Sequence, residues 1–129
     1  KRIAVVPVIT KSNKHKVCLV TSRCKRKWIV PTGKPEKRLS NRKVAAIEAF
    51  EEAGLLGKID KKFCKIIDIA SPSGRKSRKT TLYLIRVEKQ LKSWPEKKQR
   101  RRILVNPGQL DKYLSDKKLK KAIHAHFIN

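Results

Sequence analysis

Acidic residues are scarce in this chain of 129 residues, which has 35 lysines and arginines but only 10 aspartates and glutamates. The resulting formal net charge of +25 raises the local concentration of polyanions around the protein. Nucleic acids, anionic membrane surfaces and polyphosphates are therefore candidate partners. The alternative is that the scattered lysines only decorate a solvated surface.

The chain also lacks long apolar runs and many aromatic residues. No apolar stretch approaches the ~20 residues of a membrane-spanning helix, and no signal-peptide pattern is recognisable. Aromatic residues make up only 5% of the chain, which leaves few stacking platforms for single-stranded nucleic acid. A length of 129 residues with 39% hydrophobic residues fits one globular domain over residues 1–129.

Paired cysteines are absent as well. Cys18, Cys24 and Cys64 have no short paired spacing, which argues against a disulfide framework or a zinc site. Cys18 lies in an apolar run and is expected to be a small core residue. This cysteine pattern favours a reducing compartment, and we expect the protein to be cytoplasmic.

The order of strand and helix signals predicts an α/β sandwich around a mixed sheet. Pro7 suggests that the first strand lies at a sheet edge or contains a bulge. Ser40 is suited to cap a helix that ends at Ala53, and Gly54 is placed where a left-handed residue ends a helix. Strands are expected at 3–9, 17–21, 28–31, 65–70, 81–87 and 103–105, and further helices at 109–114 and 116–127.

Three of the ten acidic residues, Glu48, Glu51 and Glu52, fall within five positions of that first helix. Spacings of three and four place side chains on one helix face, so these carboxylates repel one another unless they share protons, basic partners or a cation. Carboxylate oxygens suit Mg²⁺, which also keeps places for water and phosphate. The cluster therefore predicts metal-assisted chemistry on a phosphorylated substrate. Ile47 and Phe50, with Ala46 nearby, are expected to form the apolar face of the helix.

Residues 33–55 resemble the Nudix hydrolase signature. That signature reads Gly, five residues, Glu, seven residues, Arg-Glu, an apolar residue, any residue, Glu-Glu, any residue, Gly and an apolar residue. The matching positions are Gly33, Glu48, Ala49, Glu51, Glu52, Gly54 and Leu55. Two positions depart: Leu39 replaces the first Glu, and Ile47 replaces the Arg.

The match extends beyond the signature and resembles one branch, the diphosphoinositol polyphosphate phosphohydrolases, which also act on dinucleoside polyphosphates. The residues that carry this wider likeness are Trp28-Ile29-Val30-Pro31, Ala45-Ala46, and Trp94-Pro95-Glu96 followed by an arginine run. The resemblance implies an α/β/α sandwich and hydrolysis of a phosphoanhydride, such as a diphosphoinositol polyphosphate or a dinucleoside polyphosphate. It also implies Mg²⁺, or Mn²⁺, as the cofactor.

The resemblance also assigns site residues. Glu48, Glu51, Glu52 and the carbonyl of Gly33 are the implied metal ligands. Glu51 or Glu52 would orient or deprotonate water, and Glu96 is a second candidate base. A basic rim would hold the remaining phosphates, and its members are Arg23, Lys34, Lys37, Arg38, Arg78 and Arg101.

The two departures leave the three helix carboxylates in place. Without the arginine at Ile47, the carboxylates depend more on a metal or on lysines from elsewhere. We expect Leu39 to pack as an apolar residue before the Ser40 cap. Two other functions stay open. One is an RNA-binding or RNA 5′-end-processing protein, suggested by the basic runs at 25–27 and 97–102, and the other is a catalytically silent sensor.

Overall fold

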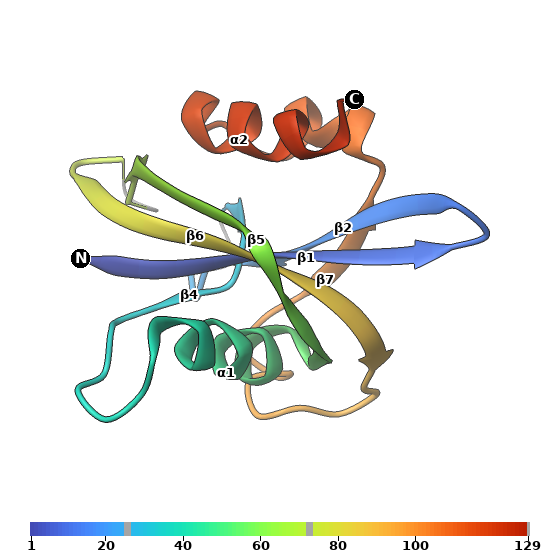
Figure 1. The fold of residues 1–129 in the computed structure, drawn as a ribbon, viewed down its shortest axis with the longest axis horizontal. Helices are drawn as coiled ribbons and strands as arrows, with labels where there is room; N and C mark the ends of the chain where they lie inside the picture. Colours follow the sequence, from blue (N-terminus) through green and yellow to red (C-terminus); the bar gives the residue numbers. More distant parts are fainter. Residues whose placement is uncertain (25–26, 72–73, 129) are drawn as a thin grey trace.

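A mixed β-sheet lies between two helices in the computed structural model, which describes residues 1–24, 27–71 and 74–128 (Figure 1). Helix α1 (Asn41–Ala53) covers one face of the sheet, and helix α2 (Lys117–Phe127) covers the other. The α/β/α sandwich predicted from the sequence is therefore confirmed. Residues 25 and 26 of the basic run 25–27 lie outside the described residues. None of the described helices is long and apolar enough to cross a membrane.

The sheet is antiparallel except for the pairing of β1 with β6, which is parallel. The main order is β3-β2-β1-β6-β5, while β4 pairs with β1 and β7 pairs with β2. A 3₁₀-helix (Pro107–Lys112) leads into α2. The strands are β1 (Arg2–Lys11), β2 (Lys14–Thr21), β3 (Trp28–Ile29), β4 (Thr32–Gly33), β5 (Leu55–Ala70), β6 (Ser77–Gln90) and β7 (Arg102–Val105).

Pro7 lies in the interior strand β1, so the expectation of an edge or a bulge is wrong. Opposite β6, Pro7 pairs with Ile85 in a continuous register. The Val5 N–H donates to Pro31 O at 3.0 Å on the other side of β1, and the nitrogen of Pro7, two residues on, faces that same side. There β1 changes its partner, because its pairing with β4 stops at Ala4 and its pairing with β2 starts at Val8. The missing N–H of proline therefore costs no ladder hydrogen bond.

Strand β1 is buried on both faces and supplies both halves of the core. Ile3 and Val5 pack in the cluster under α1, whereas Ala4 and Val6 pack in the cluster under α2. This alternation follows from the two-residue period of a strand. It explains why the first strand reads as a continuous apolar run. Cys18 is fully buried in the α1 cluster, as expected.

The ends of α1 are where the sequence predicted them. Ser40 Oγ accepts a hydrogen bond from Lys43 N at 3.1 Å, and Gly54 has a left-handed backbone with φ 67°. Leu39 packs against the α1 cluster before this cap, as expected.

The predicted apolar face of α1 is wrong. The buried residues are Val44, Ala45, Ala49, Glu52 and Ala53, whereas Ile47 and Phe50 are only half-buried. Alanines four residues apart allow the helix to lie close to the sheet. The helix therefore buries these small side chains and leaves the larger Ile47 and Phe50 partly exposed. Because Glu52 shares this stripe with the alanines, it is carried into the interior.

Two further elements differ from the sequence prediction. Strand β5 begins at Leu55, ten residues before the predicted start, and it lies at the sheet edge with only Leu55 and Phe63 buried, so its sequence lacks a clear apolar strand pattern. A register shift between Ile59 and Cys64 interrupts it, where Asp60 Oδ1 accepts from Lys62 N at 2.7 Å. The helix expected at 109–114 is a 3₁₀-helix that starts at Pro107.

Trp94 anchors the segment 91–101 beneath the C-terminal end of α1. Its Nε1 donates to Glu52 O at 3.0 Å, and the guanidinium of Arg102 lies 4.2 Å from the ring centroid. Arg102 Nη1 also donates to Ala53 O at 2.8 Å, which places a cation at the negative end of the helix dipole. The indole ring lies directly against Gly54, where a Cβ would be 2.6 Å from Trp94 Cε3.

We expect Gly54→Ala to destabilise the protein by at least about 1 kcal/mol. A left-handed alanine is strained, and its methyl group collides with the indole ring of Trp94. Urea unfolding monitored by circular dichroism measures the change. Gly108→Ala is the matched control, because no atom lies within 4 Å of a Cβ at Gly108. Equal losses of stability in the two variants would contradict this account of the helix end.

Candidate active site

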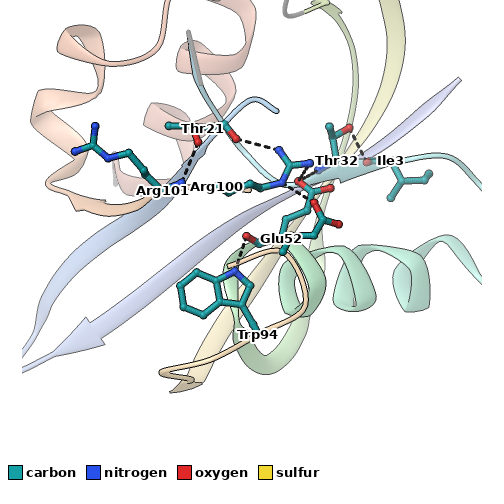
Figure 2. A network of polar contacts seen from close by, with 8 residues as sticks. Ile3, Thr21, Thr32, Glu52, Trp94, Arg100 and Arg101 are labelled. Atoms are coloured by element: carbon teal, nitrogen blue, oxygen red, sulfur yellow. Dashed lines mark hydrogen bonds and ion pairs between the residues drawn. The ribbon is translucent and has the colours of Figure 1, made fainter. Parts of the chain in front are cut away.

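Glu52 is an acidic side chain buried between α1 and the sheet. Its side chain is only 4% exposed, and its Oε1 accepts a hydrogen bond from Thr32 N at 3.2 Å. Arg100 Nη2 lies 3.7 Å from the same oxygen. In Figure 2, the backbone carbonyl of Glu52 lies above the indole of Trp94, and Thr32 and Arg100 contact its carboxylate. The carboxylate is therefore held by one backbone donor and one cation.

Glu48, one turn earlier on α1, lies against Gly33 of strand β4. A Cβ at Gly33 would be 2.2 Å from Glu48 Oε2, so only glycine leaves room for this carboxyl group. The carboxyl groups of Glu48 and Glu52 lie within hydrogen-bond reach of each other. Such a bond forms only when at least one of the two carboxyl groups carries a proton. The signature thus places an acid pair and its glycine in direct contact.

The environment raises the pKa of both glutamates. Burial is the largest cause for Glu52, whose pKa rises to about 8 despite the opposing charge of Arg100. Burial is also the largest cause of the raised pKa of Glu48, and the negative charges of Glu51 and Glu96 add to it. Burial therefore outweighs the attraction of the cation that lies beside Glu52.

That cation is Arg100, which is 8% exposed. Its Nε donates to Glu96 Oε1 at 2.7 Å, and its Nη1 donates to Thr21 O at 2.9 Å. Arg100 thereby joins the end of β2, the loop carboxylate Glu96 and the helix carboxylate Glu52. Figure 2 shows the guanidinium reaching from the loop toward Glu52.

Glu51 and Glu96 lie at the outer side of the acid pair. Glu96 N donates to Glu51 O at 3.0 Å, which ties the loop to the helix backbone. Glu51 is half-exposed, and Glu96 is bound to Arg100. Across the ranges that the structure describes, no three acidic, histidine or cysteine side chains converge as a ready-made metal site.

The chemistry of the acid pair nevertheless fits a divalent cation. Glu48 and Glu52 present oxygen ligands that share a proton, and a hard cation can replace that proton. Mg²⁺ needs only one or two protein carboxylates when phosphate oxygens and water complete its shell. The contact of Glu48 with Gly33 also brings the backbone at Gly33 to the same place.

A pocket opens at Thr32, the residue whose backbone N–H contacts Glu52, although none of the site glutamates lines it. Its apolar walls include Trp28, Ile29, Val30, Leu114 and Leu119, and its charged lining residues are Arg2, Lys27, Arg78 and Asp116. Burial and the charge of Arg78 lower the pKa of Arg2, while Glu52 and Glu48 oppose that shift. Arg2 therefore interacts electrostatically with Arg78 in the pocket and with both Glu48 and Glu52.

The predicted basic rim is only partly assembled around this pocket. Arg78 lines the pocket, and Arg101 lies 6.0 Å from the ring centroid of Trp28, which is a pocket wall. The other four candidates are exposed and do not line it: Arg23, Lys34, Lys37 and Arg38. Their role in substrate binding stays a prediction.

Sequence reasoning missed four groups of this site: Arg100, Arg2, Lys27 and the N–H of Thr32. Glu96 and Arg100 are four residues apart, but a run of basic residues gives no sign of which one turns inward. Arg2 belongs to β1, far from the signature in sequence. Only the pairing of β1 with β4 reveals that it is near.

Comparison with known proteins agrees at the level of the fold. The structure matches a C. elegans Ap4A hydrolase with a TM-score of 0.74 and 13% identity, over 99% of this chain and 97% of that chain. The chain has the Nudix fold. A Nudix hydrolase from M. smegmatis, RenU, matches with a TM-score of 0.67 and 14% identity, over 96% of this chain and 81% of that one.

A third solved structure, the Nudix domain of Shewanella oneidensis NrtR complexed with ADP ribose, matches with a TM-score of 0.64. It is 12% identical and is aligned over 98% of this chain and 87% of that chain. No family model and no curated protein matches the chain by sequence. These similarities establish the Nudix fold, and the site itself must support any activity.

We expect the metal-free protein to lose stability as pH rises from 5 to 8. Because the pKa of Glu52 is raised from 4.5 to about 8, the folded protein binds more protons than the unfolded chain in this window. Stability from this group is complete below pH 4.5 and is lost as pH passes 8. The slope contributed by one such group is up to about 1.4 kcal/mol per pH unit.

Urea unfolding in EDTA at several pH values measures this slope. Glu52→Gln should flatten it, whereas Glu88→Gln, which changes an exposed carboxylate on β6, should leave it unchanged. An identical slope in wild type and Glu52→Gln would show that Glu52 titrates normally.

Proposed function

We propose that this protein hydrolyses a phosphoanhydride bond in a nucleoside polyphosphate, of which a dinucleoside polyphosphate is one example, with Mg²⁺ or Mn²⁺ as cofactor. The observation that carries the proposal is the contact of the half-buried Glu48 with Gly33 and with the buried Glu52, together with a pocket lined with cations that reaches this site at Thr32. Such a pair has no structural use that an apolar pair would not serve better. The Nudix fold supports the same reaction.

Glu48, Glu52 and the carbonyl of Gly33 would hold the cation, and Glu51 would complete the set. When bound, a divalent cation neutralises phosphate oxygens and lowers the pKa of a bound water. The contribution of the protein is to fix these oxygen ligands on one rigid helix and one short strand, so that the reacting groups meet in one orientation.

Proton transfer falls to the same carboxylates. Water attacks phosphorus, the bridging P–O bond breaks, and the proton lost by water passes to a carboxylate base. Glu52, with its raised pKa, and Glu51 are the first candidates, and Glu96 is a further one. Arg2, Lys27 and Arg78 would bind the remaining phosphates through charge-assisted hydrogen bonds.

The pocket walls favour a nucleoside over an inositol as the non-reacting part of the substrate. Trp28, Ile29 and Leu114 form an apolar surface in the pocket that Thr32 connects to Glu52. A purine or pyrimidine ring offers an apolar face to such walls, whereas a fully phosphorylated inositol offers none. The neighbours crystallised as an Ap4A hydrolase and as an ADP-ribose complex support this choice.

A panel of anhydrides, assayed with Mg²⁺ or Mn²⁺ by phosphate and nucleotide release, tests the proposal. Dinucleoside polyphosphates should be cleaved faster than inositol pyrophosphates. Glu52→Gln and Glu51→Gln should reduce kcat by roughly 10²–10⁴-fold, the range expected for loss of a catalytic base. The exposed Glu88→Gln variant is the control, and unaltered turnover in Glu52→Gln would refute the proposal.

Gly33→Ala should lower kcat while the fold persists. The added methyl group collides with the carboxyl end of Glu48, which can rotate away, so the displacement falls on the acid pair rather than on the backbone. We expect a loss of about 10²-fold, since a displacement of about 1 Å has that effect on catalysis. Circular dichroism checks the fold, and wild-type kcat in a folded variant would argue against a role for the Glu48–Gly33 contact.

Binding of RNA, or removal of a phosphate from an RNA 5′ end, is the second candidate, and the net charge of +25 favours it. RNA binding of this origin depends steeply on salt concentration. A catalytically silent sensor would bind the same ligands without turnover.

Cys18 and Cys64 are thiols, which supports a reducing compartment such as the cytoplasm.

A further inference from the structure

We propose that Arg100 is a positioning residue for the proposed hydrolysis, fixing the carboxylates of Glu52 and Glu96 in the orientation that the reaction needs. This inference rests on the proposed function and goes beyond it, because the resemblance includes the arginine run 100–102 but assigns no role to Arg100. The basis is a buried guanidinium that donates hydrogen bonds to Glu96 and Thr21 and forms an ion pair with Glu52, three partners from three parts of the chain.

The three nitrogens of the guanidinium each face a different partner. Nε donates to Glu96 Oε1 at 2.7 Å, Nη1 donates to Thr21 O at 2.9 Å, and Nη2 lies 3.7 Å from Glu52 Oε1. A planar fork with fixed donor directions sets the angle of each partner as well as its distance. Lysine, with one ammonium group, could supply the charge but not these three directions.

The backbone beside Arg100 is itself held in place. Thr21 N donates to Arg101 O at 3.1 Å, and Arg101 N donates to Thr21 Oγ1 at 2.9 Å. Figure 2 shows the second of these bonds, from Arg101 N to Thr21 Oγ1 at the end of β2. Because Trp94 fixes the other end of the loop to α1, the guanidinium cannot withdraw from the acids without breaking these contacts.

Arg100 also determines which oxygens are available for chemistry. Both contacts of Glu52, from Thr32 N and from Arg100, go to Oε1, and the contact of Glu96 with Arg100 also goes to Oε1. The second oxygen of each carboxylate is therefore directed elsewhere, and Glu52 uses its carboxyl group to reach Glu48. Helix α1 supplies no arginine to the acids itself. Residue 47 is isoleucine, and Arg42, the one arginine of this helix, donates to Asp60 O.

The test compares Arg100→Lys and Arg100→Met with wild type on the best nucleoside polyphosphate of the panel. Lys98→Gln is the matched control, because Lys98 is an exposed cation of the same loop. We expect Arg100→Met to reduce kcat by about 100-fold with KM changed less than about threefold, the signature of lost orientation rather than lost binding. Arg100→Lys should recover only part of kcat, and Lys98→Gln should behave as wild type.

A double-mutant cycle provides a readout that does not depend on turnover. Glu96→Gln, Arg100→Lys and the combined variant are compared by urea unfolding, and the two changes should be strongly non-additive because the side chains are in direct contact. The cycle uses conservative changes, so it remains available even if Arg100→Met does not fold.

Three results would overturn the proposal. Wild-type kcat in folded Arg100→Met would leave Arg100 with a structural role only, and a raised KM at constant kcat would make it a substrate-binding residue. Additive stability changes in the cycle would deny the contact. If wild type cleaves none of the anhydrides, the proposed function fails first and the positioning role fails with it.

Discussion

The structure depends on one costly contact, the meeting of the Glu48 and Glu52 carboxyl groups inside a sandwich of apolar residues. Buried carboxylates lose the hydration that stabilises their charge, and two together repel each other. Here the repulsion is reduced by protonation, which the raised pKa of Glu52 favours, by the N–H of Thr32 and by the guanidinium of Arg100. Thr32 and Arg100 come from separate parts of the chain, so the sandwich must be assembled before the pair is tolerable.

Several local features serve that contact. The alanines at 45, 49 and 53 bring α1 close enough to the sheet for Glu52 to reach β4, and the missing side chain at Gly33 leaves room for Glu48. At the end of the helix, Trp94 and Arg102 bind the carbonyls of Glu52 and Ala53. These two contacts keep the loop that carries Glu96 and Arg100 against the acids.

Residues whose role is local were predictable from the sequence. Ser40 as a cap, Gly54 as a left-handed helix end and the shared helix of the glutamates depend on neighbours a few positions away. The α/β/α fold followed from the order of elements and from the resemblance at 33–55. The likeness in structure to Nudix hydrolases confirms that fold at 12–14% sequence identity, where a sequence match alone is weak.

Residues whose role depends on distant pairing were not predictable. The inward turn of Arg100 depends on Thr21, some eighty residues earlier, and nothing in a run of basic residues marks it. The buried face of α1 was also misjudged, because hydrophobicity ranks isoleucine and phenylalanine above alanine. Close packing against the sheet selected the smaller residue instead, and this choice carried Glu52 inward.

The most direct test of this account is the number of protons released when Mn²⁺ binds. Isothermal titration calorimetry at pH 7, in buffers that differ in ionisation enthalpy, measures this number. If the acid pair shares a proton and yields it to a cation, wild type should release close to one proton per Mn²⁺, and Glu52→Gln should release almost none. Saturable Mn²⁺ binding without proton release, or no binding at all, would contradict the account.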